Sequence, residues 1–123
     1  MFEILEYPEG QKTPFLFFDG NKGILKMKGK CIPEYATLFF EELNLFLDRY
    51  EKTPLEILDV TIDLEYFNTI TARELINIFR KFKKFPTQIT WCHEKNDTDM
   101  IDAGQDFNEI LGTIPFTFKI VER

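Results

Sequence analysis

Within the segment 57–67, positions 58–66 alternate between apolar and polar side chains without interruption, and a helical pattern follows almost at once. The apolar positions are Leu58, Val60, Ile62, Leu64 and Tyr66, and the polar ones are Asp59, Thr61, Asp63 and Glu65. Alternation of period two predicts a β-strand with one buried face and one wet, acidic face. Evenly spaced acids of this kind are typical of a solvated surface, so they predict neither a metal site nor an acid–base pair. A long strand that leads directly into a helix restricts the fold, because it makes half of a β-α-β unit.

The start of the helix after this strand is marked by Thr71 and Glu74, which have the spacing of a capping box. We therefore predict Thr71 as the residue that caps the helix, and we expect Thr71→Ala to cost about 1 kcal/mol of stability. Thr69 then lies two residues upstream, exposed and near the positive end of the helix, where a phosphoryl group is tolerated. A second interpretation stays open, in which Asn68 and Thr69 only form a polar turn.

The remaining patterns predict a single α/β domain over residues 1–123. Strands are expected at 2–7, 15–19, 24–28, 57–67, 88–93 and 115–121, and helices at 34–50, from Thr71 to the break at Lys84-Phe85-Pro86, and at 98–111. The glycine-rich turn at 19–23 predicts an antiparallel hairpin, whereas helical crossovers predict parallel strands beginning near 57, 88 and 115. The expected fold is thus one mixed β-sheet with an N-terminal antiparallel part and about three packed helices. Thr69 would follow the carboxyl end of a strand, where such sheets carry functional loops.

Two aromatic side chains need an interpretation of their own. Helix 34–50 carries an apolar stripe that we predict to face the core, made of Ala36, Phe39, Leu43, Phe46, Leu47 and Tyr50. Phe40 lies off this stripe, so we favour packing at its margin, with exposure for a partner as the alternative. His93 ends its strand without a nucleophile or a second His at a useful spacing, and we interpret it as an ordinary loop residue.

The charge and the cysteines exclude several classes of protein. The chain has a formal net charge of −6, whereas nucleic acid requires clustered basic residues. We interpret the basic run at 80–84 as a complement to a helix C-terminus, with a docking patch as the alternative. Cys31 and Cys92 have neither disulfide nor metal spacing, which favours reduced thiols in the cytoplasm. The acidic N-terminus, and the lack of an apolar run near roughly 18 residues, predict neither secretion nor membrane insertion.

No catalytic arrangement is recognisable in the sequence. It has no nucleophile and base at a known spacing and no phosphate-binding loop for ATP or GTP. Residues 97–102 begin like a calcium loop, but Asp102 stands where such a loop needs Gly, and Asn108 where it needs Glu. The sequence therefore predicts a protein that is not an enzyme and that takes no cofactor or metal.

Short motifs of a known family are spread along most of the chain. They are Thr13-Pro14, the turn at 19–23, Leu25, Gly29, Pro33-Glu34, Phe39-Phe40, Tyr66-Phe67-Asn68-Thr69, Trp91, the segment 97–100, Gly104 and Asp106-Phe107. Their order and spacing, from about residue 13 to the C-terminus, resemble the SiaC-type bacterial phosphoproteins that regulate biofilm formation. The fold of that family is similar to the STAS domains of anti-sigma-factor antagonists, so the resemblance implies a STAS-like domain.

The resemblance implies a phosphorylation switch at Thr69. A Ser/Thr kinase would modify Thr69, a metal-dependent phosphatase of the PP2C type would reverse this, and the unmodified protein would activate a diguanylate cyclase in c-di-GMP signalling. Asn68, Ile70 and Thr71 would form the switch loop and helix cap, with Ile70 standing where the family usually has a serine. The proposed capping role of Thr71 argues against it as a second acceptor. The alternative function is that of an anti-sigma-factor antagonist, a partner-switching protein that acts on a sigma-factor regulator.

Overall fold

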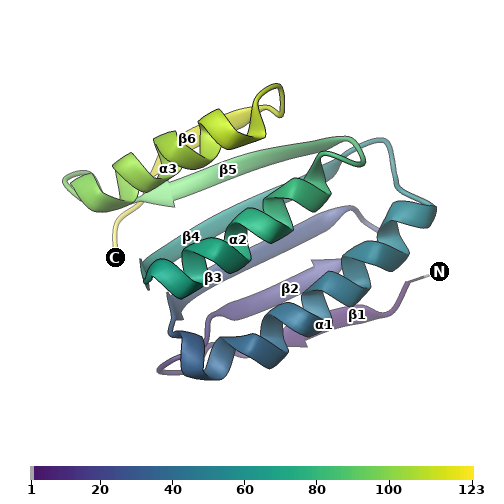
Figure 1. Ribbon diagram of the computed structural model, residues 1–123, viewed down its shortest axis with the longest axis horizontal. Coiled ribbons are helices and arrows are strands. Elements are labelled where there is room, and N and C mark those ends of the chain that lie inside the picture. Colours follow the sequence, from purple (N-terminus) through teal and green to yellow (C-terminus); the bar gives the residue numbers. More distant parts are fainter. Residues whose placement is uncertain (1) are drawn as a thin grey trace.

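The computed structural model describes residues 2–123, except for the side chains of 33–37, and in this part three helices pack on a six-stranded sheet (Figure 1). The elements in chain order are β1 (Ile4–Tyr7), β2 (Phe15–Asp19), β3 (Ile24–Cys31), α1 (Pro33–Lys52), β4 (Leu58–Phe67), α2 (Thr69–Phe82), β5 (Thr87–His93), α3 (Thr98–Leu111) and β6 (Phe116–Ile120). The order and type of these elements agree with the sequence prediction. β3 and α1 are longer than predicted, and α2 begins earlier.

The strands follow one another across the sheet in the order of the chain. β1, β2 and β3 pair antiparallel, whereas β3, β4, β5 and β6 pair parallel, which confirms the predicted mixed sheet. Each parallel connection runs through one helix, and such crossovers are right-handed in almost all proteins. Because the sheet always grows toward the same edge, one hand places every crossover helix on one face. Figure 1 shows α1, α2 and α3 together on that face.

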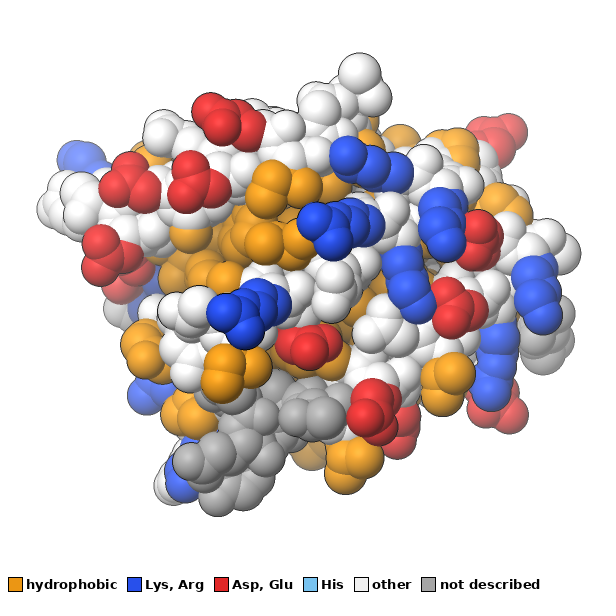
Figure 2. Space-filling model, viewed as in Figure 1, with side chains coloured by type: hydrophobic (Ala, Val, Ile, Leu, Met, Phe, Trp, Pro, Cys, Tyr) orange, Lys and Arg blue, Asp and Glu red, His pale blue; other side chains and the backbone are white. Residues whose placement is uncertain are grey.

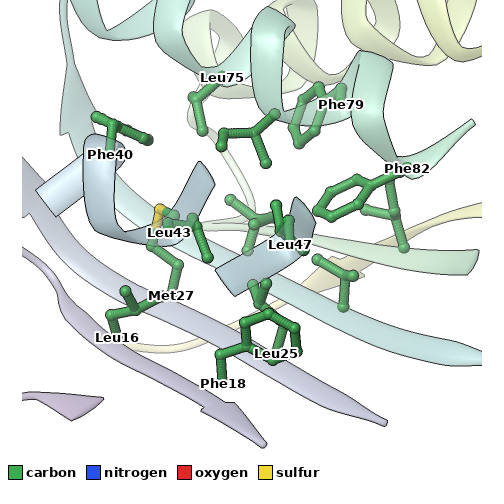
Figure 3. Packing of buried hydrophobic residues seen from close by; sticks show 14 of the residues in the cluster. Leu16, Phe18, Leu25, Met27, Phe40, Leu43, Leu47, Leu75, Phe79 and Phe82 are labelled. Atoms are coloured by element: carbon green, nitrogen blue, oxygen red, sulfur yellow. The ribbon is translucent and has the colours of Figure 1, made fainter. Parts of the chain in front are cut away.

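The core lies between this face and the helices. Figure 3 shows buried side chains of the strands, α1 and α2 in contact, and it labels Leu16, Phe18, Leu25, Met27, Phe40, Leu43, Leu47, Leu75, Phe79 and Phe82. None of these is more than 2 % exposed. The packing interpretation of Phe40 is therefore confirmed, and its ring lies 5.1 Å from that of Phe39. The stripe predicted on α1 faces the core at its described positions, while Ala36 lies outside the described side chains.

A β-bulge near the end of β4 changes which side chains are buried. Gly29 of β3 pairs with Leu64, but the next residue, Lys30, pairs with Tyr66, so the register moves on by one residue. Such a shift reverses the alternation of the side chains beyond it. The prediction that Tyr66 belongs to the buried face is therefore wrong, since it is 53 % exposed. Phe67 turns inward instead, and its ring lies 6.1 Å from that of Phe107.

The opposite face of the sheet is polar over its central strands. Lys26 and Lys28 of β3 are exposed there, as is Asp59 of β4. Asp63 is half-buried, because Arg123 from the end of the chain pairs with its carboxylate. The solvated acidic face that the alternation predicts is thus present, with one carboxylate partly covered.

α2 and α3 begin beside each other, because they follow neighbouring parallel strands. Each starts at the carboxyl end of its strand, β4 or β5, and both ends lie at one edge of the sheet (Figure 1). Gly104 lets α3 lie close to β5, since a Cβ atom there would be 2.6 Å from Cδ1 of the buried Trp91. The indole Nε1 of Trp91 also donates a hydrogen bond of 2.9 Å to the carbonyl of Met100. These contacts fix the start of α3 relative to the sheet.

Candidate functional site

Asn68 caps α2 and makes Thr69 its first residue. The side-chain oxygen of Asn68 accepts hydrogen bonds of 3.1 Å from the backbone N–H groups of Ile70 and Thr71. Its backbone carbonyl accepts the first helical bond, 2.9 Å, from the N–H of Ala72. Asparagine is among the best residues for this role, because its short amide satisfies N–H groups that have no partner within the helix. Thr69 is exposed at this end of the helix.

The prediction that Thr71 caps the helix is wrong. Thr71 is completely buried in the first turn of α2, and its hydroxyl donates a hydrogen bond of 3.3 Å to the carbonyl of Cys31 at the end of β3. The backbone N–H of Thr71 is one of the two groups that Asn68 caps. Thr71 therefore joins the helix to the sheet, and the capping box read from its spacing to Glu74 is not formed.

A hollow of about 440 Å³ opens beside Thr69, and we call it the α2–α3 hollow. Its lining residues are Glu65, Tyr66, Phe67, Asn68, Thr69, Ala72, Asp97, Asp99, Met100 and Ala103. They come from the end of β4, and from the caps and first two turns of α2 and α3. The hollow thus has apolar walls, two helix N-termini and three carboxylates. Figure 2 shows apolar surface between these two helices, with acidic side chains gathered over α3.

The start of α3 repeats the arrangement of α2 with a charged cap. Asp97 accepts a hydrogen bond of 3.1 Å from the N–H of Met100, and Asp99 follows in the first turn. The acidic segment 97–102 therefore marks the start of a helix, as its position in the sequence predicts. The residues around 97–102 and around Thr69 do not by themselves indicate that the two segments meet. The parallel order of β4 and β5 is the signal that could have indicated it, because it places their carboxyl ends side by side.

Exposed apolar side chains flank Thr69. Ile70 is 55 % exposed and Tyr66 is 53 % exposed, on either side of the Asn68–Thr69 pair. Large apolar side chains that gather on a surface are typical of protein interfaces. Of the four residues predicted for the switch, Asn68, Thr69 and Ile70 thus lie at the surface or its margin, whereas Thr71 lies inside.

The reactive groups in the described lining of the hollow are carboxylates and hydroxyls. Among its described lining residues there is no His, Cys or Lys that could act as a base or nucleophile. Nor does the described part of the chain hold a group of three or more His, Cys, Asp or Glu side chains that could bind a metal ion. Burial raises the pKa of the Cys31 thiol to about 11, although the Thr71 hydroxyl opposes this, so Cys31 carries its proton at neutral pH.

The interpretation of His93 as a loop residue is wrong. His93 is the last residue of β5 and is only 6 % exposed, with its Nδ1 2.7 Å from the carbonyl oxygen of Glu94. Its ring also lies 6.1 Å from that of Phe118 on β6. His93 is therefore part of the packed sheet.

In the described residues, no helix has the length and apolar character needed to cross a membrane.

Comparison with known proteins identifies the family. The pattern of the SiaC family, described as the SiaC family regulatory phosphoprotein, matches residues 7–121. This chain belongs to the SiaC family. The family predicted from the sequence motifs is thereby confirmed.

Relatives of this SiaC-family chain are distant in sequence but similar in structure. An uncharacterized protein of Pseudomonas aeruginosa (strain UCBPP-PA14) is 22 % identical over 120 residues, which are 94 % of each chain. The crystal structure of apo-SiaC from P. aeruginosa has a TM-score of 0.86 and 21 % identity, and the match covers 95 % of this chain and 98 % of that one. SiaC in complex with the diguanylate cyclase SiaD, which it activates, has a TM-score of 0.87 and 21 % identity, covering 95 % and 99 %. At this identity, the structural matches establish the fold.

Proposed function

We propose that this SiaC-family protein is a non-enzymatic regulator that binds and activates a diguanylate cyclase while Thr69 is unmodified. The position of Thr69 carries the proposal. It is the exposed first residue of α2, at the hollow where two helix N-termini meet. The complex of P. aeruginosa SiaC with SiaD supports a diguanylate cyclase as the partner.

Phosphorylation would change the hollow in both charge and volume. A phosphate on Thr69 adds about −1.5 to −2 charge at pH 7. It would enter a hollow whose rim already holds Glu65, Asp97 and Asp99, on a chain with a net charge of −6. The added charge would repel an acidic partner, and the phosphate would fill space that the partner uses. Phospho-Thr69 is therefore the form that releases the cyclase.

A Ser/Thr kinase and a PP2C-type phosphatase would set the state of the switch. Thr69 is exposed to such enzymes, whereas Thr71 is completely buried and its hydroxyl is bonded to Cys31. We therefore assign Thr69 as the acceptor in this loop and leave Thr71 out.

The first test maps the phosphate. Intact-mass and fragment-ion analysis would compare wild type, Thr69→Ala and Thr98→Ala, each purified from the native host. Thr98 is the matched control, because it is the exposed first residue of α3. We expect the mass of one phosphoryl group on Thr69 in wild type and in Thr98→Ala, and none in Thr69→Ala. Its absence from wild type under several growth conditions would contradict the switch.

The second test measures the effector. A diguanylate cyclase that co-purifies with the tagged protein would be assayed for c-di-GMP formation from GTP, with unmodified or phosphorylated protein added. We expect the unmodified protein to raise the rate and the phosphorylated protein to leave it at its basal level. Equal activation by both forms would refute control by Thr69. Recovery of an ATP-binding anti-sigma kinase in place of a cyclase would support the alternative of an anti-sigma-factor antagonist.

A further inference from the structure

The outer side of α1 carries two large apolar side chains in contact with solvent. Leu38 is 71 % exposed and Leu45 is 57 % exposed. They are seven residues apart, and this spacing places them two turns apart on one side of the helix. The other large apolar side chain that is exposed on a described helix is Ile70, which flanks Thr69. The two leucines therefore mark a surface that is separate from the α2–α3 hollow.

Two opposite charges lie on the same side of α1 as these leucines. Glu42 is three residues before Leu45, and Arg49 is four residues after it. Both are exposed, and within the described residues neither takes part in an ion pair. The Arg49 guanidinium lies 5.2 Å from the ring centroid of the half-buried Phe46, so it packs along this side of the helix. We call Leu38, Glu42, Leu45, Phe46 and Arg49 the α1 stripe.

The α1 stripe borders the β1 edge of the sheet. Tyr7 of β1 lies beside Glu42, because burial raises the pKa of the Tyr7 phenol to about 12, and a hydrogen bond to Glu42 and its negative charge add to the rise. The opposite side of α1 is closed toward α2, where Lys81 binds Asp48 at 2.7 Å. Figure 1 shows α1 beside β1, and the outer edge of β1 pairs with no described strand. A partner that reaches the stripe therefore reaches the edge of the sheet as well.

The charges of the α1 stripe are self-complementary. Glu42 and Arg49 lie at equal distances before and after the middle of the stripe, which falls at Leu45 and Phe46. In an antiparallel pair of helices, each position meets the position at the same distance beyond the middle of the other helix. Each Glu42 would then face the Arg49 of the other copy, and the two Leu45 side chains would meet.

We infer that the α1 stripe binds the same stripe of a second copy of the chain, in a dimer with a twofold axis. Such an axis makes one patch serve on both subunits, which is the commonest symmetry of oligomers. An axis perpendicular to the sheet makes the α1 helices antiparallel and brings the two β1 edges toward each other, which shields an edge strand from other chains. Each Leu38 would lie along the aliphatic stem of Lys52 in the other copy. The two Glu42–Arg49 pairs would fix the register, since a shifted register leaves these charges unpaired.

The mass of the protein in solution is the first test. Each copy has a net charge of −6, which opposes association, so we expect a dissociation constant of micromolar order. Sedimentation equilibrium from about 5 to about 500 µM covers this range. We expect the mass to rise with concentration from 14.6 kDa toward twice that value. A mass that stays at 14.6 kDa throughout would overturn the inference.

Charge reversal tests the pairing itself. Glu42→Arg and Arg49→Glu each place like charges opposite one another, and each should weaken the dimer by about tenfold or more. An equimolar mixture of the two variants should dimerise like wild type, because both contacts between the different variants pair opposite charges. Glu109→Arg on α3 and Arg80→Glu on α2 make the same changes at exposed positions away from the stripe, and they should leave the dimer unchanged. Single variants that dimerise like wild type, or a mixture no tighter than either variant alone, would overturn the pairing.

A disulfide reports the twofold axis directly. In Leu45→Cys the two new thiols would meet at the axis, within reach of a disulfide when oxidised glutathione is the oxidant. Cys31 and Cys92 are buried and stay out of this reaction. The control is Ile120→Cys, which lies 60 % exposed on β6 at the opposite edge of the sheet. We expect a covalent dimer of Leu45→Cys and only a glutathione adduct of Ile120→Cys. A covalent dimer of both variants, or of neither, would overturn the axis.

The dimer and the proposed function can fail separately, because the dimer uses neither Thr69 nor the hollow. If the wild-type protein stays a monomer and still activates the cyclase, the dimer is overturned and the proposed function stands. If the dimer forms as expected but phosphorylation of Thr69 leaves activation unchanged, control by Thr69 is refuted and the dimer stands.

Discussion

The first turns of α2 and α3 have the same local design but opposite electrostatics. Each helix begins with a threonine, Thr69 or Thr98, directly after a side chain that caps backbone N–H groups. In α2 the cap is the neutral Asn68, and the first turn holds no acid. In α3 the cap is Asp97, and Asp99 lies in the first turn.

This difference favours Thr69 over Thr98 as the site of the proposed phosphate. The N-terminus of a helix carries about half a positive charge, which an acidic residue in the first turn offsets. At α3 two carboxylates already do so, whereas the N-terminus of α2 keeps its charge for an incoming anion. A phosphate on Thr69 would be attracted by its own helix and repelled by the carboxylates of α3 across the hollow. Position within a helix therefore does not separate the two threonines, whereas the charge of the cap favours Thr69, the acceptor that we propose.

The largest effect expected from this comparison is on activation of the cyclase. Thr69→Asp places a permanent charge at the hollow and should reduce c-di-GMP formation to the basal rate of the cyclase alone. Thr98→Asp adds a charge to a helix start that is already acidic and should keep activation near the wild-type level. Thr69→Val, which removes the hydroxyl without adding charge, should also activate. Loss of activation in both Asp variants would show that net charge, and not the acceptor position, controls binding.

A stability difference at alkaline pH is the next largest effect. Cys31 lies under the first turn of α2, and burial raises the pKa of its thiol to about 11, although the Thr71 hydroxyl lowers it in part. The unfolded chain releases this proton near pH 8.5. Stability from the buried thiol is thus fully present below about pH 8.5 and is lost as the pH rises toward 11, by about 3 kcal/mol.

Urea unfolding between about pH 7.5 and pH 11 would check this dependence, because that range spans the titration of the thiol in the unfolded chain and most of it in the folded chain. Cys31→Ala should flatten the fall in the free energy of unfolding. Cys92→Ala should flatten it less, because the positive charges of Lys119 and Arg123 oppose the rise in the pKa of the Cys92 thiol that burial and Asp63 cause. A fall of the same size in Cys31→Ala would assign the pH dependence to other groups.

Thr71 and Thr98 should differ in their contribution to stability. Thr71→Val keeps the shape of the side chain but removes the hydrogen bond to the buried carbonyl of Cys31, at a cost of about 1 to 3 kcal/mol. Thr98→Val changes an exposed hydroxyl and should cost less than about 0.5 kcal/mol. Urea denaturation measures both values. Equal losses would mean that the bond between Thr71 and Cys31 contributes little.

The fold could be predicted from the sequence because each element carries its own periodicity. Apolar spacing identifies the helices, alternation identifies β4, and crossovers through helices determine which strands are parallel. The bulge in β4 could not be predicted, because it arises from the pairing with β3 and no residue of β4 indicates it. It is this shift that exposes Tyr66 and turns Phe67 inward.

The site was predictable only in part, because it too depends on contacts between elements that are distant in the sequence. The sequence analysis predicts Thr71 as the cap, although asparagine is at least as good a cap residue as threonine and Asn68 stands three residues earlier. The structure selects Asn68, because Thr71 is needed inside, against Cys31 at the end of β3. The hollow likewise depends on Asp97 and Asp99 from another element, so tertiary contacts determine it.

The smallest expected effect exchanges the charge of the two caps. Asn68→Asp places a carboxylate on the N–H groups of Ile70 and Thr71 and should stabilise the protein by about 0.3 to 1 kcal/mol, through the positive end of α2. Asp97→Asn should destabilise it by a similar amount at α3. The carboxylates across the hollow oppose the gain in Asn68→Asp, but they act through solvent and are screened, whereas the cap contacts its N–H groups directly.

Urea unfolding at two pH values separates these contributions. The ordinary pKa of Asp is about 3.9, so pH 7 lies above it and pH 3 lies below it. Hydrogen bonds from N–H groups hold the pKa of a carboxyl below its ordinary value. The stability that the carboxylate adds is therefore present at pH values above the ordinary pKa, and it is lost as the pH falls through the pKa of the folded state. If Asn68→Asp destabilises the protein at pH 7 and the loss disappears at pH 3, repulsion from α3 exceeds the attraction of the helix N-terminus. The neutral cap of α2 would then serve to limit repulsion between the two helix N-termini.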